Sequence, residues 1–329
     1  MDWAEQQAGP LRLTVIICAY TLDRWQAILA AVASLRGQTR TPDELILVSD
    51  HNPELLAKAA QQFPDVVCIP NEEAQGLSGA RNTGVRRATG DVVAFLDDDA
   101  AAAPDWAERL LESYADPSVI GVGGGVDPAW QAPRPSWFPD EFLWVVGCSY
   151  AGQPEVRTEA RNPIGANMSF RRAVFTQVGG FDSTMGRLGE DASGCEETEF
   201  AIRAHRLRPG TRIVLDPAAR CSHLVTDERV TRRYFRRRCV AEGRSKALLS
   251  RLAGAGPALS SERAYLRRTI PAGVARGLGD LARGDVTGAG RAAALVEGVV
   301  LTAASYLLTL ARSPSSPRAR PSTTRRRRP

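Results

Sequence analysis

Short apolar runs alternate with helical patterns between residues 11 and 126. The first run, Leu11–Cys18, is rich in β-branched residues, and Trp25–Arg36 then carries apolar residues at helical spacing. Strands that alternate with helices predict an α/β fold with a doubly wound, mostly parallel sheet flanked by helices, which binds ligands at the carboxyl ends of its strands. Further strands are expected at Glu44–Ser49, Val66–Pro70, Asp91–Leu96 and Val119–Val126, and further helices at Leu55–Phe63, Ser78–Ala88 and Pro104–Tyr114.

The pattern changes after residue 126. Residues 127–163 are rich in Pro and Trp, and from Thr231 onward the chain reads as helices that form a C-terminal extension. The expected organisation is a tail at 1–10, two halves of one α/β domain at 11–126 and 127–225, a helical extension at 226–311 and a second tail at 312–329.

Residues 292–311 form an apolar stretch that is interrupted by one charge, Glu297. Its length just reaches the roughly 20 residues that a membrane span needs. A charge near the centre of a span costs about 2.5–3.5 kcal/mol on insertion scales. We therefore expect a helix that lies against a membrane or packs on the protein rather than one that crosses a bilayer.

The basic charge of the chain is concentrated in its last residues. The formal net charge is +5, but Arg312–Pro329 carries seven arginines and no acid, so the rest of the chain is at −2. The positive net charge therefore comes from the C-terminal tail and does not indicate a nucleic-acid-binding surface, so we expect no nucleic-acid partner. Arginines attract anionic lipid at about 1 kcal/mol each, so the tail predicts peripheral membrane contact, with a solvated terminus as the alternative.

Cysteine usage and the first residues indicate the compartment. Met1–Pro10 lacks the charged start and apolar core of an export signal, and no two cysteines form a C-x-x-C pair. The expected state is a reduced, cytoplasmic protein, peripheral at the inner face of the plasma membrane if the tail attaches there. The cysteines are Cys18, Cys68, Cys148, Cys195, Cys221 and Cys239.

Three consecutive carboxylates, Asp97, Asp98 and Asp99, directly follow an apolar strand. In extended chain Asp97 and Asp99 point to one side and Asp98 to the other. Two carboxylates that converge at a strand end suit Mg²⁺ or Mn²⁺, which prefer oxygen ligands and bridge to phosphates. An acidic turn without function has the same sequence, so the residues upstream distinguish a metal site from such a turn.

That context is the segment Asn71–Gly84, where glycines and Ser78 precede a helix. Free N–H groups and the dipole at a helix start favour an anion, and Arg81, one turn into the helix, is placed to reach a phosphate or a base. Together with Thr14–Tyr20 and Leu45–Asp50, these motifs resemble the family 2 glycosyltransferases, which have the GT-A fold. The resemblance covers roughly residues 11 to 225.

The resemblance implies a nucleotide-sugar donor site in 11–126 and an acceptor site in 127–225. Asp50 corresponds to the residue that contacts uracil, although Ser49 stands where the family usually has another aspartate. A UDP-linked donor is therefore expected. The implied donor-binding residues are Ala19, Tyr20, Thr21, Asp50, Arg81, Asp97, Asp98, Gly165 and Asn167, the last two from a segment that resembles the family's G-x-N motif.

The resemblance also implies a metal site and a groove. In related transferases a histidine at the position of His223 completes the metal site, so Asp99, Asp97 and His223 are the predicted ligands of Mn²⁺ or Mg²⁺. On the acceptor side, a group of large aromatic residues either lines a sugar-binding groove or covers an open edge of the core, and both readings stay open. These residues are Trp130, Trp137, Phe138, Phe142 and Trp144.

The catalytic base is expected in Ser193–Arg203. Ser193 and Glu196 have the spacing of a capping box, which offers Glu196 a structural role. Glu197 has no such role and occupies the position of the family's Glu-Asp motif, whose aspartate deprotonates the acceptor hydroxyl. Glu197 is the predicted base, Glu196 is the second candidate, and Glu190 and Asp191 are more distant ones.

The predicted function is an inverting, metal-dependent transfer of one sugar from a nucleotide-diphosphate sugar to the hydroxyl of a small-molecule or lipid-linked acceptor. Two alternatives are a nucleotide-sugar-binding protein without transferase activity and a sugar nucleotidyltransferase. The second would carry a Gly-rich basic loop after the first strand, and Cys18–Thr21 has none. A processive synthase would need several membrane spans and a Gln-x-x-Arg-Trp motif, and the sequence has neither.

Overall fold

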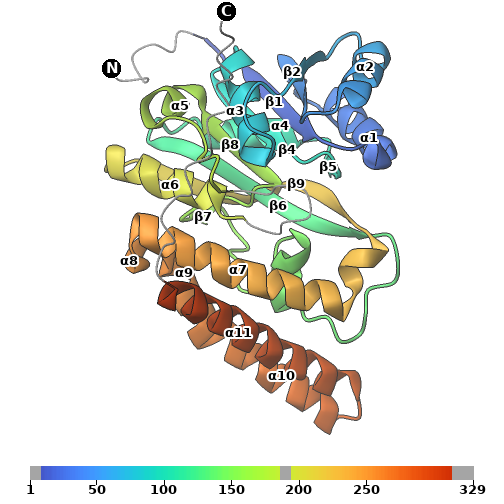
Figure 1. The fold of residues 1–329 in the computed structure, drawn as a ribbon, viewed down its shortest axis with the longest axis vertical. Coiled ribbons are helices and arrows are strands. Elements are labelled where there is room, and N and C mark those ends of the chain that lie inside the picture. Colours follow the sequence, from blue (N-terminus) through green and yellow to red (C-terminus); the bar gives the residue numbers. More distant parts are fainter. Residues whose placement is uncertain (1–8, 186–193, 313–329) are drawn as a thin grey trace, which may run out of the picture.

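The computed structural model describes residues 9–185 and 194–312. A nine-stranded sheet forms its centre, with the strand order β3-β2-β1-β4-β8-β6-β9-β5 and with β7 paired to β9 (Figure 1). The first four strands in that order are parallel to one another and complete the predicted alternation of strands and helices. Their bounds are β1 Leu13–Ala19, β2 Glu44–Ser49, β3 Val67–Pro70 and β4 Val92–Leu96.

The other half of the sheet is mixed. Strand β8 pairs antiparallel with both β4 and β6, and β9 runs parallel to β6 but antiparallel to β5 and β7. The predicted α/β fold class is confirmed. The sheet as a whole is mixed, whereas the sequence pattern predicts a mostly parallel one. The bounds are β5 Ala100–Ala102, β6 Val119–Trp130, β7 Thr158–Glu159, β8 Asn167–Arg171 and β9 Arg212–Val225.

Both faces of the sheet are buried under helices. Along β1, Val15 and Ile17 belong to one core cluster and Ile16 to the other, because successive side chains of a strand point to opposite faces. The covering helices are α1 Trp25–Arg36, α2 Pro53–Gln62, α3 Leu77–Arg87, α4 Trp106–Ser113, α5 Arg172–Val178 and α6 Glu196–Leu207. Short 3-10 helices are η1 Leu22–Arg24, η2 Asp140–Val146 and η3 Asp227–Val230.

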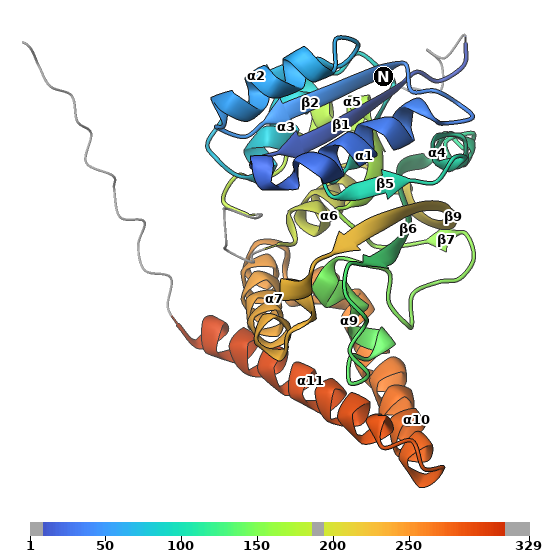
Figure 2. The ribbon, with the colours of Figure 1, turned by 90° about the vertical axis from the view of Figure 1, so that its right-hand side faces the viewer.

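The C-terminal helices stack below the sheet in the view of Figure 1, with α7 between the sheet and the pair α10–α11. Figure 2 shows that α11 runs along α7 and that α10 returns beside α11. The helical extension that the sequence predicts from Thr231 onward is confirmed. Its elements are α7 Arg232–Ala253, α8 Ala255–Ala258, α9 Ser260–Ala264, η4 Tyr265–Thr269, α10 Ile270–Ala282 and α11 Thr287–Ala311.

The aromatic residues that follow β6 join this extension to the core. The ring of Phe235, in α7, lies 5.6 Å from Trp137, 5.7 Å from Phe138 and 5.2 Å from Phe142, measured between centroids. Trp130 packs on Phe138 and Trp144 packs on Phe142. Of the two readings of this group, these ring contacts support the cover for the core, although Phe138 also lines a cavity.

Strands β6, β8 and β9 approach one another closely at Gly124. A Cβ on Gly124 would lie 1.9 Å from the carbonyl oxygen of Ala219 and 2.3 Å from Nδ2 of Asn167, so even one methyl group has no room. We expect Gly124→Ala to lower the free energy of unfolding by about 3 kcal/mol, the upper range for overpacking a core, in urea denaturation. The control is Gly37→Ala, whose Cβ would meet its nearest neighbour at 3.5 Å. Equal stability of the two variants would contradict this packing.

Candidate active site

The sheet brings the aspartate triplet and His223 together. The triplet links β4 to β5, and β5 pairs antiparallel with β9 so that Ala100 lies opposite His223. The backbone N–H of Leu224 donates to the carbonyl of Asp99 at 2.8 Å, which locks the two segments. As a result Oδ1 of Asp99 lies 3.0 Å from Nε2 of His223, although 124 positions separate them in the chain.

These residues form a candidate metal centre. Asp97, Asp99 and His223 each offer one ligand atom, and the three atoms lie within 4.8 Å of one another. Two carboxylate oxygens and one imidazole nitrogen are a donor set that fits Mn²⁺ well and Mg²⁺ acceptably. The sequence-predicted ligand set is therefore assembled in one place, and its chemistry fits a divalent ion.

The ring of His223 is held by a loop that sequence reasoning missed. Gly147 adopts a φ of +83°, and a Cβ there would lie 3.2 Å from Cε1 of His223. Nδ1 of the same ring lies 4.0 Å from Sγ of Cys148, whose thiol is free like those of the other five cysteines. Nothing in the local pattern of Gly147 and Cys148 indicates this contact, because it depends on how η2 folds onto β9.

Two arginines that the sequence did not single out neutralise the triplet. Arg24 lies 2.7 Å from Oδ1 of Asp98 and 3.2 Å from Oδ2 of Asp99, and Arg229 lies 3.0 Å from Oδ2 of Asp99. Burial alone would raise the pKa of Asp99, but His223, Arg229 and Arg24 together hold it below its usual range. Burial raises the pKa of Asp98 to about 7 against the pull of Arg24.

Asp98 itself faces away from solvent. It is buried, its Oδ1 is bound to Arg24, and its Oδ2 has no hydrogen-bond partner among the described residues. Asp97 is the most exposed of the three carboxylates. Of the triplet, Asp97 is therefore the residue most open to a ligand from solution.

Asp50 organises the loop before α3. Its Oδ2 accepts from the backbone N–H of Gly76 at 2.9 Å, and its Oδ1 accepts from Nδ2 of Asn71 at 2.7 Å. The carboxylate thus ties the end of β2 to the glycine-containing segment that was expected to meet an anion. Asn71 and Gly76 belong to that segment, but the sequence did not predict their bond to Asp50.

The end of β1 offers one exposed ring. Ala19 is buried, whereas the ring of Tyr20 is 44% exposed and lies 5.2 Å from the guanidinium carbon of Arg24. The side chain of Thr21 accepts from the backbone N–H of Asp23 and starts the turn η1. Of the three predicted residues here, Tyr20 presents a side chain to a ligand while Ala19 and Thr21 shape the backbone.

Arg81 bridges the two acidic clusters. Its guanidinium is buried and donates to Oε1 of Glu196 at 2.8 Å and to the carbonyl of Gly165 at 2.9 Å, and it lies 3.5 Å from Oδ1 of Asp97. One planar group therefore contacts the end of β4, the loop before β8 and the start of α6. The aspartate triplet and the glutamate pair lie on the same side of the molecule, within reach of one guanidinium.

Helix α6 begins differently from the sequence prediction. Its N-cap is Cys195, with a φ of +74°, and Glu196 is the first helical residue. The expected capping box, which needs Glu196 in the third position of the helix, is therefore wrong, and Glu196 pairs with Arg81 instead. Ser193, Glu190 and Asp191 lie outside the described residues.

Glu197 differs from Glu196 in its surroundings. It is partly exposed, its Oε1 accepts from Oγ1 of Thr198 at 3.1 Å, and its Oε2 lies 3.9 Å from the position of a Cβ on Gly165. The surrounding protein desolvates it, and this, together with the charge of Glu196, raises the pKa of Glu197 to about 7. A carboxylate with a pKa near neutrality and room beside a glycine is suited to exchange protons with a substrate.

Asn167 lies in the core, which corrects its predicted place in the donor site. It is fully buried, its Nδ2 donates at 2.9 Å to the carbonyls of both Gly125 and Ala219, and its Oδ1 accepts from Nε1 of Trp106 at 2.8 Å. These bonds hold β6, β8 and β9 to α4 and leave no open face for a sugar. Gly165, from the same motif, does lie at the site beside Arg81 and Glu197.

The helical extension supports the site from behind. The backbone N–H of Gly194 donates to Oγ of Ser245 in α7 at 3.1 Å. Glu262, in α9, pairs with Lys246 of α7 at 2.5 Å and with Arg161 at 2.8 Å. Since Gly194 precedes α6 and Arg161 precedes the Gly165 loop, α7 and α9 anchor the segments that lead to Glu197 and to Gly165.

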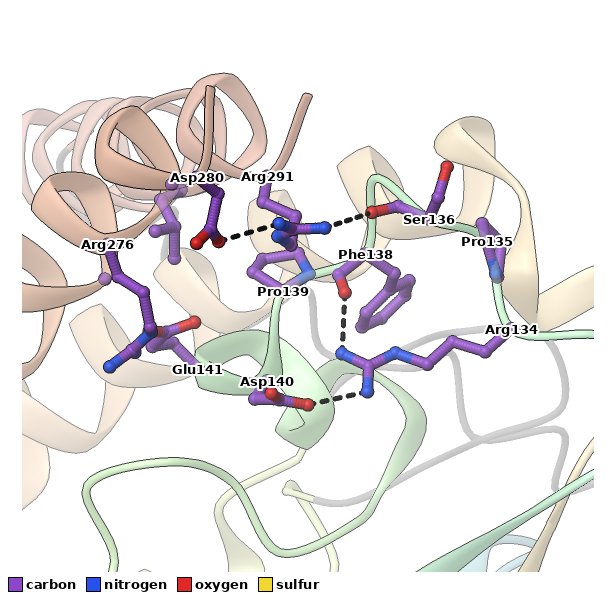
Figure 3. Close-up of a pocket in the computed structure, with 13 residues that line it drawn as sticks. Arg134, Pro135, Ser136, Phe138, Pro139, Asp140, Glu141, Arg276, Asp280 and Arg291 are labelled. Carbon is purple, nitrogen blue, oxygen red and sulfur yellow. Dashed lines mark hydrogen bonds and ion pairs between the residues drawn. The ribbon is translucent and has the colours of Figure 1, made fainter. Parts of the chain in front are cut away.

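A cavity of about 400 Å³ lies elsewhere, between η2 and helices α10 and α11 (Figure 3). None of the predicted site residues lines it. Its three guanidinium groups already have acidic partners: Arg134 pairs with Asp140, Arg276 with Glu141 and Arg291 with Asp280. The cavity therefore has no free positive charge to offer a diphosphate.

Comparisons with known proteins agree with the geometry. The model of the glycosyl transferase family 2 matches residues 14–179. The chain belongs to this family. The chain is 37% identical, over 74% of its length and 78% of the relative, to a glucosyl-dolichyl phosphate glucuronosyltransferase of Haloferax volcanii. It is 25% identical to the succinoglycan biosynthesis protein ExoM of Rhizobium meliloti, over 73% of the chain and 75% of the relative.

Solved structures share the fold. A mannosyltransferase of Pyrobaculum calidifontis, PcManGT, in complex with GDP-Man and Mn²⁺, superposes with a TM-score of 0.56 at 17% identity, over 91% of this chain and 88% of that one. GalNAc-T7 with UDP, GalNAc and Mn²⁺ superposes with a TM-score of 0.51 at 16% identity, over 71% and 48%. The expected GT-A fold and the assignment to glycosyltransferases are confirmed, which sets aside the binding-protein and nucleotidyltransferase alternatives.

The buried pair of Arg81 and Glu196 should contribute strongly to stability. We expect Glu196→Ala to lower the free energy of unfolding by about 3 kcal/mol in urea denaturation, because it removes one partner of a buried charge while Asp97 and Gly165 remain. The matched control is Glu199→Ala on the same helix, which removes a more exposed i,i+4 pair with Arg203 and should cost about 1 kcal/mol or less. A smaller loss for Glu196→Ala than for the control would contradict the role of the pair.

Proposed function

We propose that this glycosyltransferase moves one sugar from a UDP-linked donor to an acceptor hydroxyl with inversion at the anomeric carbon. The observation that carries the proposal is the Arg81 bridge, which joins Asp97 to Glu196, while Glu197 lies beside Gly165 without an ion pair to Arg81. In this proposal residues 11–126 hold the donor and residues 127–225 hold the acceptor.

Asp97, Asp99 and His223 would hold Mn²⁺ or Mg²⁺ in the working enzyme. A divalent ion at this place supplies positive charge to the departing diphosphate. The two structural neighbours that contain Mn²⁺ together with a nucleotide or nucleotide sugar support this choice. Asp50, Tyr20 and the loop that ends at Gly76 would receive the nucleoside.

Glu197 is the proposed base. Its carboxylate takes the proton of the acceptor hydroxyl while that oxygen attacks the anomeric carbon, and the bond from the same carbon to the diphosphate oxygen breaks. Because attack comes from the face opposite the leaving group, the configuration inverts. A positioned general base contributes about 10²–10⁴ in rate. Arg81 and Glu196 orient this end of the site, and Gly165 leaves the space that a side chain would fill.

The acceptor class follows from the Haloferax volcanii relative, whose name describes transfer to glucosyl-dolichyl phosphate. That relative matches over most of both chains. We therefore propose a sugar linked through phosphate to a lipid as the acceptor, in preference to a free small molecule.

The metal proposal is tested by titrating UDP and GDP by calorimetry with and without Mn²⁺. We expect UDP to bind more tightly than GDP and to need Mn²⁺. Asp99→Asn should weaken Mn²⁺-dependent UDP binding by about 100-fold or more, because it removes a proposed metal ligand. The loss of a residue that only holds a ligand in place costs about 10–100-fold. The matched control is Asp65→Asn, an exposed partner of Arg36 far from the site, which should leave binding unchanged. Tighter binding of GDP would overturn the donor assignment.

The pH dependence tests the base. A carboxyl group whose pKa is raised to about 7 is protonated below that pH, so kcat should rise as the pH increases through about 7. Glu197→Gln should lower kcat by about 10²–10⁴ and remove this rise while UDP binding persists. Transfer to a glycosyl-polyprenyl phosphate in detergent is the assay, and NMR of the product gives its anomeric configuration. A rise in kcat that survives in Glu197→Gln, or a retained configuration, excludes this mechanism.

A further inference from the structure

The solvent-facing side of α11 is apolar along its whole length. Every residue of this helix that is exposed is Ala, Val or Leu. Val296, Val300 and Leu307 are 52%, 58% and 62% exposed. A helix on the surface of a water-soluble body normally presents polar residues to solvent, so this pattern is inverted. The exposed residues are Ala289, Ala293, Val296, Val300, Ala303, Ala304, Leu307, Leu308, Leu310 and Ala311.

Helix α10 and its connection to α11 also expose apolar residues. Leu278 and Leu281 of α10 and Val286 of the connection are exposed, and α10 lies against α11 in both views of the molecule (Figures 1 and 2). We call the exposed apolar residues of α11 together with Leu278, Leu281 and Val286 the docking face. So many exposed apolar residues on two adjacent helices indicate a contact with a membrane or a partner.

The opposite side of α11 is bonded to α7 from Glu297 to the C-terminal end of the helix. Arg232 and Arg236 of α7 pair with Glu297 at 3.3 and 2.5 Å. Farther along, Oγ of Ser305 donates to the carbonyl of Val240 at 2.7 Å, and near the end Arg251 donates to the carbonyl of Thr309 at 2.6 Å.

These bonds decide how α11 meets a bilayer. By length and composition α11 is able to cross a membrane. To do so it would have to leave α7 or carry α7, with its arginines, into hydrocarbon, and either step is costly. An orientation in the plane of the interface keeps the bonds to α7 and immerses only the docking face.

The charge around the docking face favours an anionic bilayer over a second copy of this chain. The sequence that follows α11 directly, Arg312–Pro329, carries seven arginines and no acid. Arg267 and Arg268 are exposed directly before α10. Two copies of this chain would bring like charges together, whereas anionic lipid offers both an apolar interior and a negative surface.

We propose that the α10–α11 pair docks flat on an anionic membrane surface through the docking face, with the arginines at its edges bound to lipid headgroups. This inference stands on the exposed surface and does not depend on the donor or on the base. With the lipid-linked acceptor proposed above, docking keeps the enzyme at the surface where that acceptor lies.

The test is sedimentation of the full chain with vesicles of phosphatidylcholine alone and with one third phosphatidylglycerol, without donor or acceptor. The double variant Val300→Glu/Leu307→Glu should lower partitioning onto the anionic vesicles by about tenfold or more, since it places carboxylates on the immersed face. The matched control is Val156→Glu/Leu207→Glu, in which the same residue types, 71% and 58% exposed, change away from α10 and α11. Circular dichroism melting verifies that both variants fold.

Wild-type binding should weaken with salt and without phosphatidylglycerol, and alkaline carbonate should release the protein. Equal partitioning of the two double variants overturns the proposal, and so does retention after carbonate, which indicates a span. A wild-type dimer that Val300→Glu/Leu307→Glu dissociates, without vesicle binding, would assign the face to a second copy. UDP binding is measured on the same samples. If the wild-type protein binds UDP but not the anionic vesicles, docking alone is overturned, and if it binds the vesicles but not UDP, the donor proposal alone is overturned.

Discussion

The buried guanidinium of Arg81 is the constraint on which the arrangement of this site depends. A buried charge is costly unless it is paired, and here Glu196, Asp97 and the carbonyl of Gly165 share that role. These partners come from the start of α6, the end of β4 and the loop before β8. One planar group with fixed donor directions therefore sets the spacing between the aspartate triplet and the glutamate pair.

Two further groups of contacts maintain this spacing, one on each side of Arg81. On one side the pairing of β5 with β9 brings Asp99 to His223, and Arg24 and Arg229 offset the charge of the triplet. On the other side α7 and α9 hold the segments that lead to Glu197 and to Gly165, through Ser245 and Glu262. The same helix α7 also contacts α11, so the part of the molecule that supports α6 is bonded to the surface proposed to meet a membrane.

Sequence reasoning succeeded where a periodic pattern or a cluster carried the signal. The bounds of β2 and α1 agree with the prediction residue by residue, and the structure assembles Asp97, Asp99 and His223 as a group. It failed where a single residue acts through distant partners. Asn167 lies in a motif that resembles part of a sugar-donor site, but its side-chain amide makes three hydrogen bonds inside the core. Arg24 and Arg229 are ordinary arginines in the sequence, because no spacing relates them to the triplet.

The sequence by itself determined the alternation of strands and helices, the acidic triplet at a strand end, the family resemblance and the apolar character of the last helix. Each of these depends on residues that are close together in the chain. The tertiary structure alone decided the antiparallel place of β8, the αL start of α6 that turns Glu196 toward Arg81, and the side of α11 that α7 leaves uncovered. The physical reason is the same in each case. Local periodicity indicates which face of an element is apolar. The segment that covers this face and the group that pairs with each buried charge are set by contacts between residues far apart in the chain.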